Sequence, residues 1–175
     1  LDNLKIGGSV TVIDEFAFYE CGSLKNVVIP DSVINICYAA FAGCGNLTTV
    51  KIGKGVTSIS DSAFESCGRL KSVTIPDYVT YIGSEAFYNC VNLTNAKFEG
   101  NAPTEFGYGV FDCCASNFEI SAPDKDTTWT NSESYNSFAG TWNDYKISFY
   151  TPCNHAYDIN TVKATCTTSG YTTHT

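Results

Sequence analysis

The stretch LKSVTIPDYVTYIGSEAFYNC, residues 70–90, decides how this chain folds, because its pattern returns along the sequence at a fixed interval. Its opening leucine belongs to a series spaced 23 residues apart: Leu1, Leu24, Leu47, Leu70 and Leu93. A constant period of this length is typical of solenoid proteins, in which each repeat forms one coil that stacks on the next. The sequence therefore predicts a stack of similar coils.

Each unit carries the signals of a short strand, a corner and a tight turn. In the second unit, Val27 and Ile29 occupy alternate positions, which is the period of two expected of a strand. Pro30 then breaks that pattern, and we expect a corner there. The step from Phe41 to Cys44 suits one helical turn. We therefore expect every coil to combine a short strand with a short helical turn.

Six further positions keep the 23-residue step through four nearly complete units. They are Ile6, Ile29, Ile52 and Ile75; Val10, Val33, Val56 and Val79; Ile13, Ile36, Ile59 and Ile82; Ala17, Ala40, Ala63 and Ala86; Phe18, Phe41, Phe64 and Phe87; and Cys21, Cys44, Cys67 and Cys90. In a stack, each of these side chains packs on its equivalent in the next coil. These ladders are the predicted core.

The repeat decays in the fifth unit, which defines the predicted domain boundaries. Residues 110–114 fit the pattern only after a one-residue insertion, and the aromatic residues that follow no longer keep the period. We expect a solenoid over residues 1–114, a C-terminal cap over 115–150, and a tail over 151–175. The N-terminal end has no comparable cap, and the chain holds no Met, so we expect it to be an internal or processed fragment.

The composition excludes several classes of function. The chain is 43% hydrophobic and 14% aromatic, which is typical of a folded protein. Its net charge of −8 argues against nucleic acid or an anionic membrane surface as the partner. No apolar run approaches the roughly 18 residues of a membrane helix, so membrane insertion is not expected.

The cysteines allow three interpretations: metal ligands, disulfides, or small buried apolar residues. Metal sites need close C-x-x-C pairs, whereas a ladder supplies one Cys per coil, so we favour the third interpretation. The sequence predicts buried free thiols in register at Cys21, Cys44, Cys67 and Cys90. Cys37 lies off this ladder, and the sequence assigns no role to it.

Catalytic machinery is not recognisable in the repeats. The two histidines, His155 and His174, both lie in the tail, so no Ser-His-Asp or Cys-His arrangement can form within the solenoid. Together with Cys153 and Cys166 they could ligate a metal, but we favour a mobile tail from about residue 153. Carboxylates at corners and turns are expected to be solvated. We expect no catalytic residue, no metal and no cofactor.

Lysines mark one side of the predicted coil. Three of them share one outward strand position in alternate coils, and two more follow the opening leucine of the intervening coils: Lys5, Lys51, Lys97, Lys25 and Lys71. Acidic residues concentrate in the second half of each coil, so a basic strand face and an acidic opposite side are expected. The lysines are the predicted ligand-binding residues. A merely solubilising role for lysine on exposed strands is the alternative.

The unit L-x-x-V-x-I-P-x-x-V-x-x-I-x-x-x-A-F-x-x-C of residues 70–90 resembles the BspA-like leucine-rich repeats of bacterial and some protist surface proteins. The resemblance covers residues 1 to about 114 and implies a leucine-rich-repeat solenoid of about five coils with a C-terminal cap. It also implies a cell-surface or secreted protein, often an adhesin, with no catalytic residues to transfer.

A second resemblance concerns the tail. Cys153-x-His155, Ala164-Thr165-Cys166 and Gly170 are similar to a small module of Firmicutes surface proteins that normally ends in Cys-x-x-Cys-Gly. The chain stops at Thr175, so we expect this module to be truncated.

These observations favour a monomeric extracellular module that binds a host or bacterial surface protein or a glycan. A structural spacer that holds other domains away from the cell is the main alternative, and an accessory to an enzyme is a third.

Overall fold

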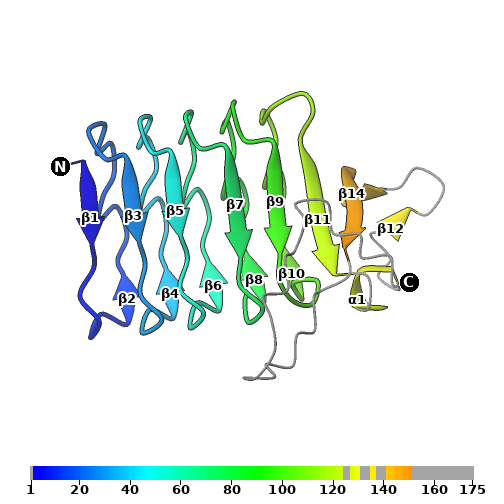
Figure 1. The fold of residues 1–175 in the computed structure, drawn as a ribbon, viewed down its shortest axis with the longest axis horizontal. Helices are drawn as coiled ribbons and strands as arrows, with labels where there is room; N and C mark the ends of the chain where they lie inside the picture. Colours follow the sequence, from blue (N-terminus) through cyan, green and yellow to red (C-terminus); the bar gives the residue numbers. More distant parts are fainter. Residues whose placement is uncertain (1, 124–126, 131–134, 137–140, 151–175) are drawn as a thin grey trace, which may run out of the picture.

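The computed structural model describes residues 2–123, 127–130, 135–136 and 141–150, which form a β-solenoid (Figure 1). The first strand of each coil lines one side of the stack: β1 (Asn3–Lys5), β3 (Asn26–Val28), β5 (Thr49–Lys51), β7 (Ser72–Ile75), β9 (Asn95–Phe98) and β11 (Glu119–Pro123). A second side is lined by β2 (Val12–Ile13), β4 (Asn35–Ile36), β6 (Ser58–Ile59), β8 (Tyr81–Ile82) and β10 (Glu105–Phe106).

Neighbouring coils pair as parallel strands in the register set by the repeat. Asn3 pairs with Asn26, and Ser72 with Asn95, each 23 residues away. Tyr81 pairs with Glu105, which is 24 residues away. The fifth unit therefore contains one extra residue, as the sequence predicted, and the insertion lies between β9 and β10. The predicted leucine-rich-repeat solenoid is confirmed.

The third side of each coil consists of hydrogen-bonded turns, where the sequence had suggested a helical turn. Two positions in each of the first five coils have a positive φ, for example Ser62 (54°) and Ser66 (56°). The Ser62 and Phe64 N–H groups donate to carbonyls of the next coil, whereas the intervening Ala63 and Glu65 N–H groups donate within their own coil. Left-handed residues end any helix, and the hydrogen bonds to the next coil satisfy the backbone instead.

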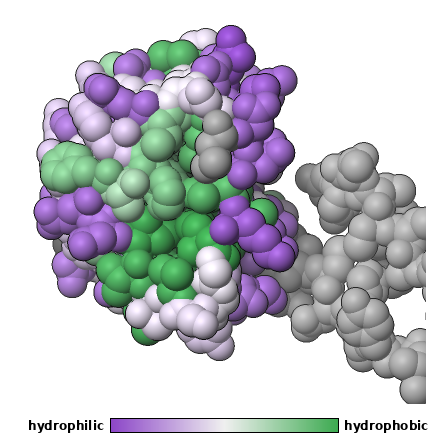
Figure 2. All heavy atoms as spheres, turned by 90° about the vertical axis from the view of Figure 1, so that its left-hand side faces the viewer, coloured by the Kyte–Doolittle hydropathy of each residue, from purple (hydrophilic) through white to green (hydrophobic). Residues whose placement is uncertain are grey.

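Five phenylalanines form a continuous stack through the core. Phe18, Phe41, Phe64, Phe87 and Phe111 lie with successive ring centroids 5.0–5.4 Å apart and nearly parallel planes. The three central rings are fully buried. Exposure of the ladder grows toward the N-terminal end, where Figure 2 shows an apolar patch framed by hydrophilic residues.

The cysteine ladder runs beside this stack, and its first member differs from the prediction. Cys44, Cys67 and Cys90 are buried free thiols in register, as predicted. Each thiol donates to the carbonyl of a phenylalanine in the preceding coil, as Cys44 does to Phe18 at 3.1 Å. Cys21 is exposed. The prediction was wrong for Cys21, because in the described structure no coil stacks on its side of the ladder.

The C-terminal region adds a strand and a hairpin to the stack. The remaining elements are α1 (Thr127–Thr130), β12 (Tyr135–Asn136), β13 (Thr141–Trp142) and β14 (Tyr145–Tyr150). β14 extends the first-strand sheet by parallel pairing with β11, and β12 and β13 pair antiparallel. Buried Trp129 and Trp142 meet edge to face with centroids 4.8 Å apart. No helix in the described part of the chain has the length and apolar character needed to cross a membrane.

Candidate binding surfaces

The outward side chains of β1, β3, β5, β7, β9, β11 and β14 form one continuous surface, which we call the strand face (Figure 1). Inward residues such as Val27 and Val73 are buried, whereas the residues between them point outward. A face built from parallel extended strands is wide and shallow, which suits a macromolecular partner better than a small molecule.

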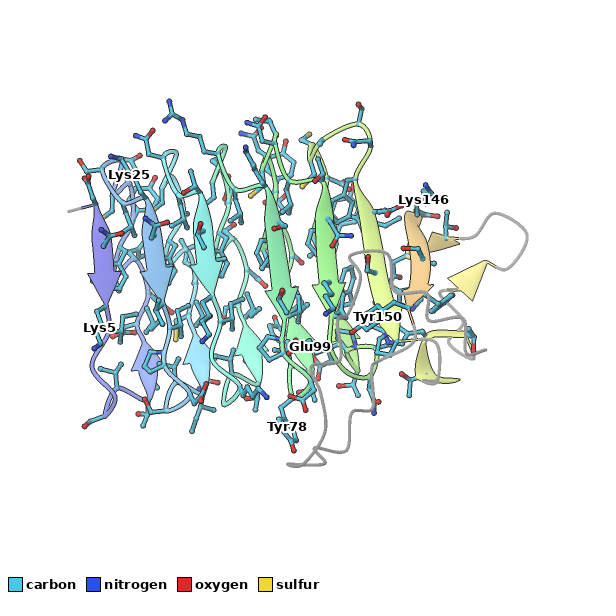
Figure 3. The ribbon with its side chains drawn as sticks, viewed as in Figure 1. Lys5, Lys25, Tyr78, Glu99, Lys146 and Tyr150 are labelled. Carbon is cyan, nitrogen blue, oxygen red and sulfur yellow. The ribbon has the colours of Figure 1, made fainter. Side chains whose placement is uncertain are left out.

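The structure places all five predicted lysines at this face, but in two rows. Lys5, Lys51 and Lys97 lie at one strand position, and the backbone register pairs Lys5 and Lys51 with the same Val28. Lys25 and Lys71 instead precede the strands. Figure 3 shows Lys25 and Lys5 at opposite ends of the strands. Four of the five are exposed, and Lys97 is half-buried.

Two of the lysines already have partners. The Lys25 ammonium lies 2.9 Å from the Asp2 carboxylate, and this hydrogen bond lowers the pKa of Asp2. Lys97 lies over the Tyr150 ring, with its Nζ 4.8 Å from the centroid. The described structure gives Lys5, Lys51 and Lys71 no side-chain partner, so these three can meet a ligand without breaking a contact.

The sequence did not identify Tyr150 or Lys146 as part of this face. The Tyr150 hydroxyl donates to the Phe98 carbonyl at 2.7 Å, which holds the ring beside Lys97. Burial, and then the charge of Glu99, raise the pKa of Tyr150. Lys146 pairs with Glu119 at 3.1 Å. Both residues lie in β14, beyond the last regular repeat, so periodicity could not reveal them.

Polar side chains at the start of the strands hydrogen-bond along the stack. The Asn26 amide donates to the Asn3 side-chain oxygen at 2.8 Å, and the Asn95 amide donates to the Ser121 hydroxyl at 2.8 Å. These bonds hold the asparagine side chains in place. The strand face is therefore a polar surface that is partly ordered by hydrogen bonds between coils.

A hollow of about 800 Å³ lies where the fifth coil departs from the repeat. Its wall includes Asp77, Tyr78, Glu99 and Asn101. Tyr78 and Glu99 are exposed, and Figure 3 shows them near the same end of the strands. The one-residue insertion between β9 and β10 lies in this region. The hollow is wide open, and its lining contains no basic residue.

The structure groups no chemically reactive set of side chains in the residues it describes. Within those residues, no three His, Cys, Asp or Glu side chains are placed to hold a metal ion. Cys37 is half-buried, and its pKa is raised by burial and by Asp14 and Glu15. The possible ligands of the tail, and the predicted mobility of residues from 153 onward, lie outside the described residues.

Comparison with known protein families identifies the repeat. The family model of the BspA type leucine rich repeat region matches residues 1–117 with six copies. The chain belongs to this family. BspA-type proteins are usually bacterial surface or secreted proteins that bind other proteins, and the leucine-rich-repeat solenoid is typically a non-enzymatic binding scaffold. No curated protein matches the chain.

Solved structures of bacterial leucine-rich repeat proteins share the fold. A cell surface protein from Faecalibacterium prausnitzii is 28% identical with a TM-score of 0.64, covering 73% of this chain and 34% of its own. A Bacteroides capillosus protein is 36% identical with a TM-score of 0.51, covering 56% of this chain and 77% of its own. The T. pallidum leucine-rich repeat protein is 26% identical with a TM-score of 0.51, covering 67% of each chain. This chain spans about a third of the Faecalibacterium protein.

Proposed function

We propose that this BspA-type solenoid is a non-catalytic adhesion module, displayed on the cell surface or secreted, whose strand face binds an acidic segment of another protein. The observation that supports this proposal is the position of Lys5, Lys51 and Lys71, which are exposed and have no side-chain partner in the described structure. The strand register aligns Lys5 with Lys51. An acidic chain of net charge −8 thus carries a local basic surface.

The proposed role of the lysines is electrostatic attraction. Single exposed charges contribute little to affinity, but charges repeated at the spacing of the coils act together over a Debye length of about 8 Å at physiological salt. Complementary charge mainly raises the association rate and makes that rate sensitive to salt. Binding through the strand face should therefore weaken steeply as salt increases.

The experiment compares two double variants that remove the same charge. Lys51→Glu with Lys71→Glu changes the strand face, whereas Lys54→Glu with Arg69→Glu changes exposed positions after β5 and before β7. With an immobilised poly-glutamate probe at low salt, the first variant should associate roughly tenfold more slowly than the parent. The second should associate at nearly the parental rate.

Equal association rates of the two variants would show that net charge alone determines binding to poly-glutamate. The alternative of a structural spacer without a ligand would then be favoured. Preferential binding of heparin over poly-glutamate would replace the acidic protein with a sulfated glycan as the partner. Both variants should fold like the parent, because none of the four side chains is buried.

A further inference from the structure

An exposed cluster of three aromatic rings, which we call the aromatic patch, lies away from the strand face on the third side of the first two coils. It consists of Phe16, Tyr19 and Tyr38, which are 50%, 48% and 45% exposed. Phe16 meets Tyr19 and Tyr38 edge to face, with centroids 5.6 and 5.2 Å away. Exposed aromatic rings that pack against one another often mark binding surfaces.

The repeat itself does not require these rings. The positions equivalent to Phe16 in the next three coils hold Ala39, Ser62 and Glu85. Moreover, Phe16 has a φ of 55°, a left-handed conformation that disfavours bulky side chains and is better tolerated by Gly or Asn. A large apolar ring at a strained, exposed position lowers stability without filling the core. Such a local conflict is typical of functional positions.

The backbone beneath the aromatic patch is fixed. The Phe16 N–H donates to the Tyr38 carbonyl at 3.1 Å, and the Tyr19 N–H donates to the Phe16 carbonyl at 3.1 Å. The Glu20 side chain lies over Gly43, where a Cβ would come within 2.9 Å of its Cγ. A rigid set of rings loses little conformational entropy when a partner binds.

Acidic residues neighbour the rings in the sequence, and basic residues are absent from this part of the chain. Hydrogen bonding to Glu20, and also the charges of Glu20 and Glu65, raise the pKa of Tyr19. Asp14 and Glu15 directly precede Phe16. No Lys or Arg occurs in residues 9–24, 32–47 or 55–68, the second and third sides of the first three coils. The partner that complements this surface is cationic.

We propose that the aromatic patch docks an extended, arginine-rich segment of a second protein. Arginine fits both features at once, because its planar guanidinium stacks on aromatic rings and donates paired hydrogen bonds to carboxylates. Lysine offers a more strongly hydrated point charge and should bind more weakly. This surface is separate from the strand face and opposite to it in charge, so the module would hold two different partners.

The test uses fluorescein-labelled hexa-arginine and hexa-lysine peptides and anisotropy titrations of the full chain at physiological salt. Hexa-arginine should bind the parent at least about fivefold more tightly than hexa-lysine. The double variant Phe16→Asn with Tyr38→Ser should weaken hexa-arginine binding about tenfold, the size expected for losing two cation–π contacts. Asn suits the left-handed backbone, so lost folding is not expected to cause this loss. Thermal unfolding of the variant verifies that point.

The matched control is Tyr78→Ser with Tyr108→Ser, which removes two exposed tyrosines elsewhere and should leave binding unchanged. The proposal is overturned if the aromatic variant binds hexa-arginine as tightly as the parent does. Weaker binding by Glu15→Gln with Glu20→Gln would then show that charge alone accounts for the affinity. The proposal is also overturned if hexa-arginine does not bind. In that case, concentration-dependent self-association abolished by the aromatic variant would identify a second copy of this chain as the occupant.

Discussion

The two ends of the phenylalanine stack contain equivalent residues in different surroundings. At the C-terminal end, Phe111 is almost fully buried, because Phe118 and Tyr145 cover it with centroids 4.7 and 5.6 Å away. At the N-terminal end, Phe18 packs on Phe41 and is only half-buried. A repeat position therefore has no fixed burial of its own. Its contribution to stability depends on having a neighbour on both sides.

The largest expected effect is at the centre of the stack. Phe64→Ala removes a fully buried ring with a partner on each face and should lower the free energy of unfolding by about 3–5 kcal/mol. Phe18→Ala should cost roughly half as much or less, because one side of that ring is already uncovered. Urea denaturation of both variants measures the difference. Equal losses would show that burial does not determine the contribution of each ring.

Covering the C-terminal ring requires a specific hydroxyl. The Tyr145 hydroxyl donates to Asp112 at 2.8 Å and accepts from the Phe111 N–H at 3.2 Å. Tyr145→Phe keeps the ring but leaves that N–H without its acceptor, which should cost about 1–2 kcal/mol in urea denaturation. The matched control, Tyr108→Phe, alters a tyrosine that is 80% exposed and should have no effect. If the two variants behave alike, the hydroxyl does not hold the cap.

The thiol ladder should report the same difference between centre and ends. Cys21 and Cys113 are exposed and should react with a thiol reagent at once, whereas Cys67 and Cys90 should react only after unfolding. Mass spectrometry of peptides from briefly labelled protein distinguishes the sites. Rapid labelling of Cys67 would contradict the closed core.

Burial of the thiols also makes stability depend on pH. Burial raises the pKa of Cys44 to about 11 from an ordinary value of 9.0. The folded thiol therefore keeps its proton where the unfolded thiol loses it, so the contribution of Cys44 to stability is constant below about pH 9 and falls between about pH 9 and 11. In urea titrations across this range, Cys44→Ala should show a smaller loss than the parent. An identical decline would assign it to other groups.

The smallest effect is expected at the open end. Lys25 and Asp2 link the first two coils through an ion pair whose side chains are 53% and 62% exposed. Exposed pairs contribute little to stability. Asp2→Asn should therefore leave the urea midpoint unchanged within error. A clear decrease would show that the first coil depends on this pair.

The sequence predicted the features that depend on the repeat alone. The spacing of the leucines predicted the parallel register, and the misfit at residues 110–114 predicted the inserted residue that shifts Glu105. The third side was less predictable. The spacing from Phe41 to Cys44 suits a helical turn, but whether an N–H bonds within its coil or to the next is a non-local choice that periodicity does not contain.

The candidate surfaces were predicted only in part. The sequence identified the lysines because they recur with the repeat. Their division into two rows at opposite ends of the strands depends on the residue at which each strand begins. Phe16 was missed because it occurs once, at a position held by small or polar residues in the next three coils. A single departure from a repeat is a signal for function, but only the structure shows whether that residue faces the core or solvent.

The turns of the third side also give the solenoid an electrical polarity along its length. At each junction of the first five coils, three N–H groups of one coil point at carbonyls of the next, as with Phe16, Phe18 and Glu20. The aligned peptide dipoles add as they do in a helix. The row therefore points its negative ends toward the N-terminal side of the stack and its positive ends toward the C-terminal side, so that charges of opposite sign are favoured on its two sides.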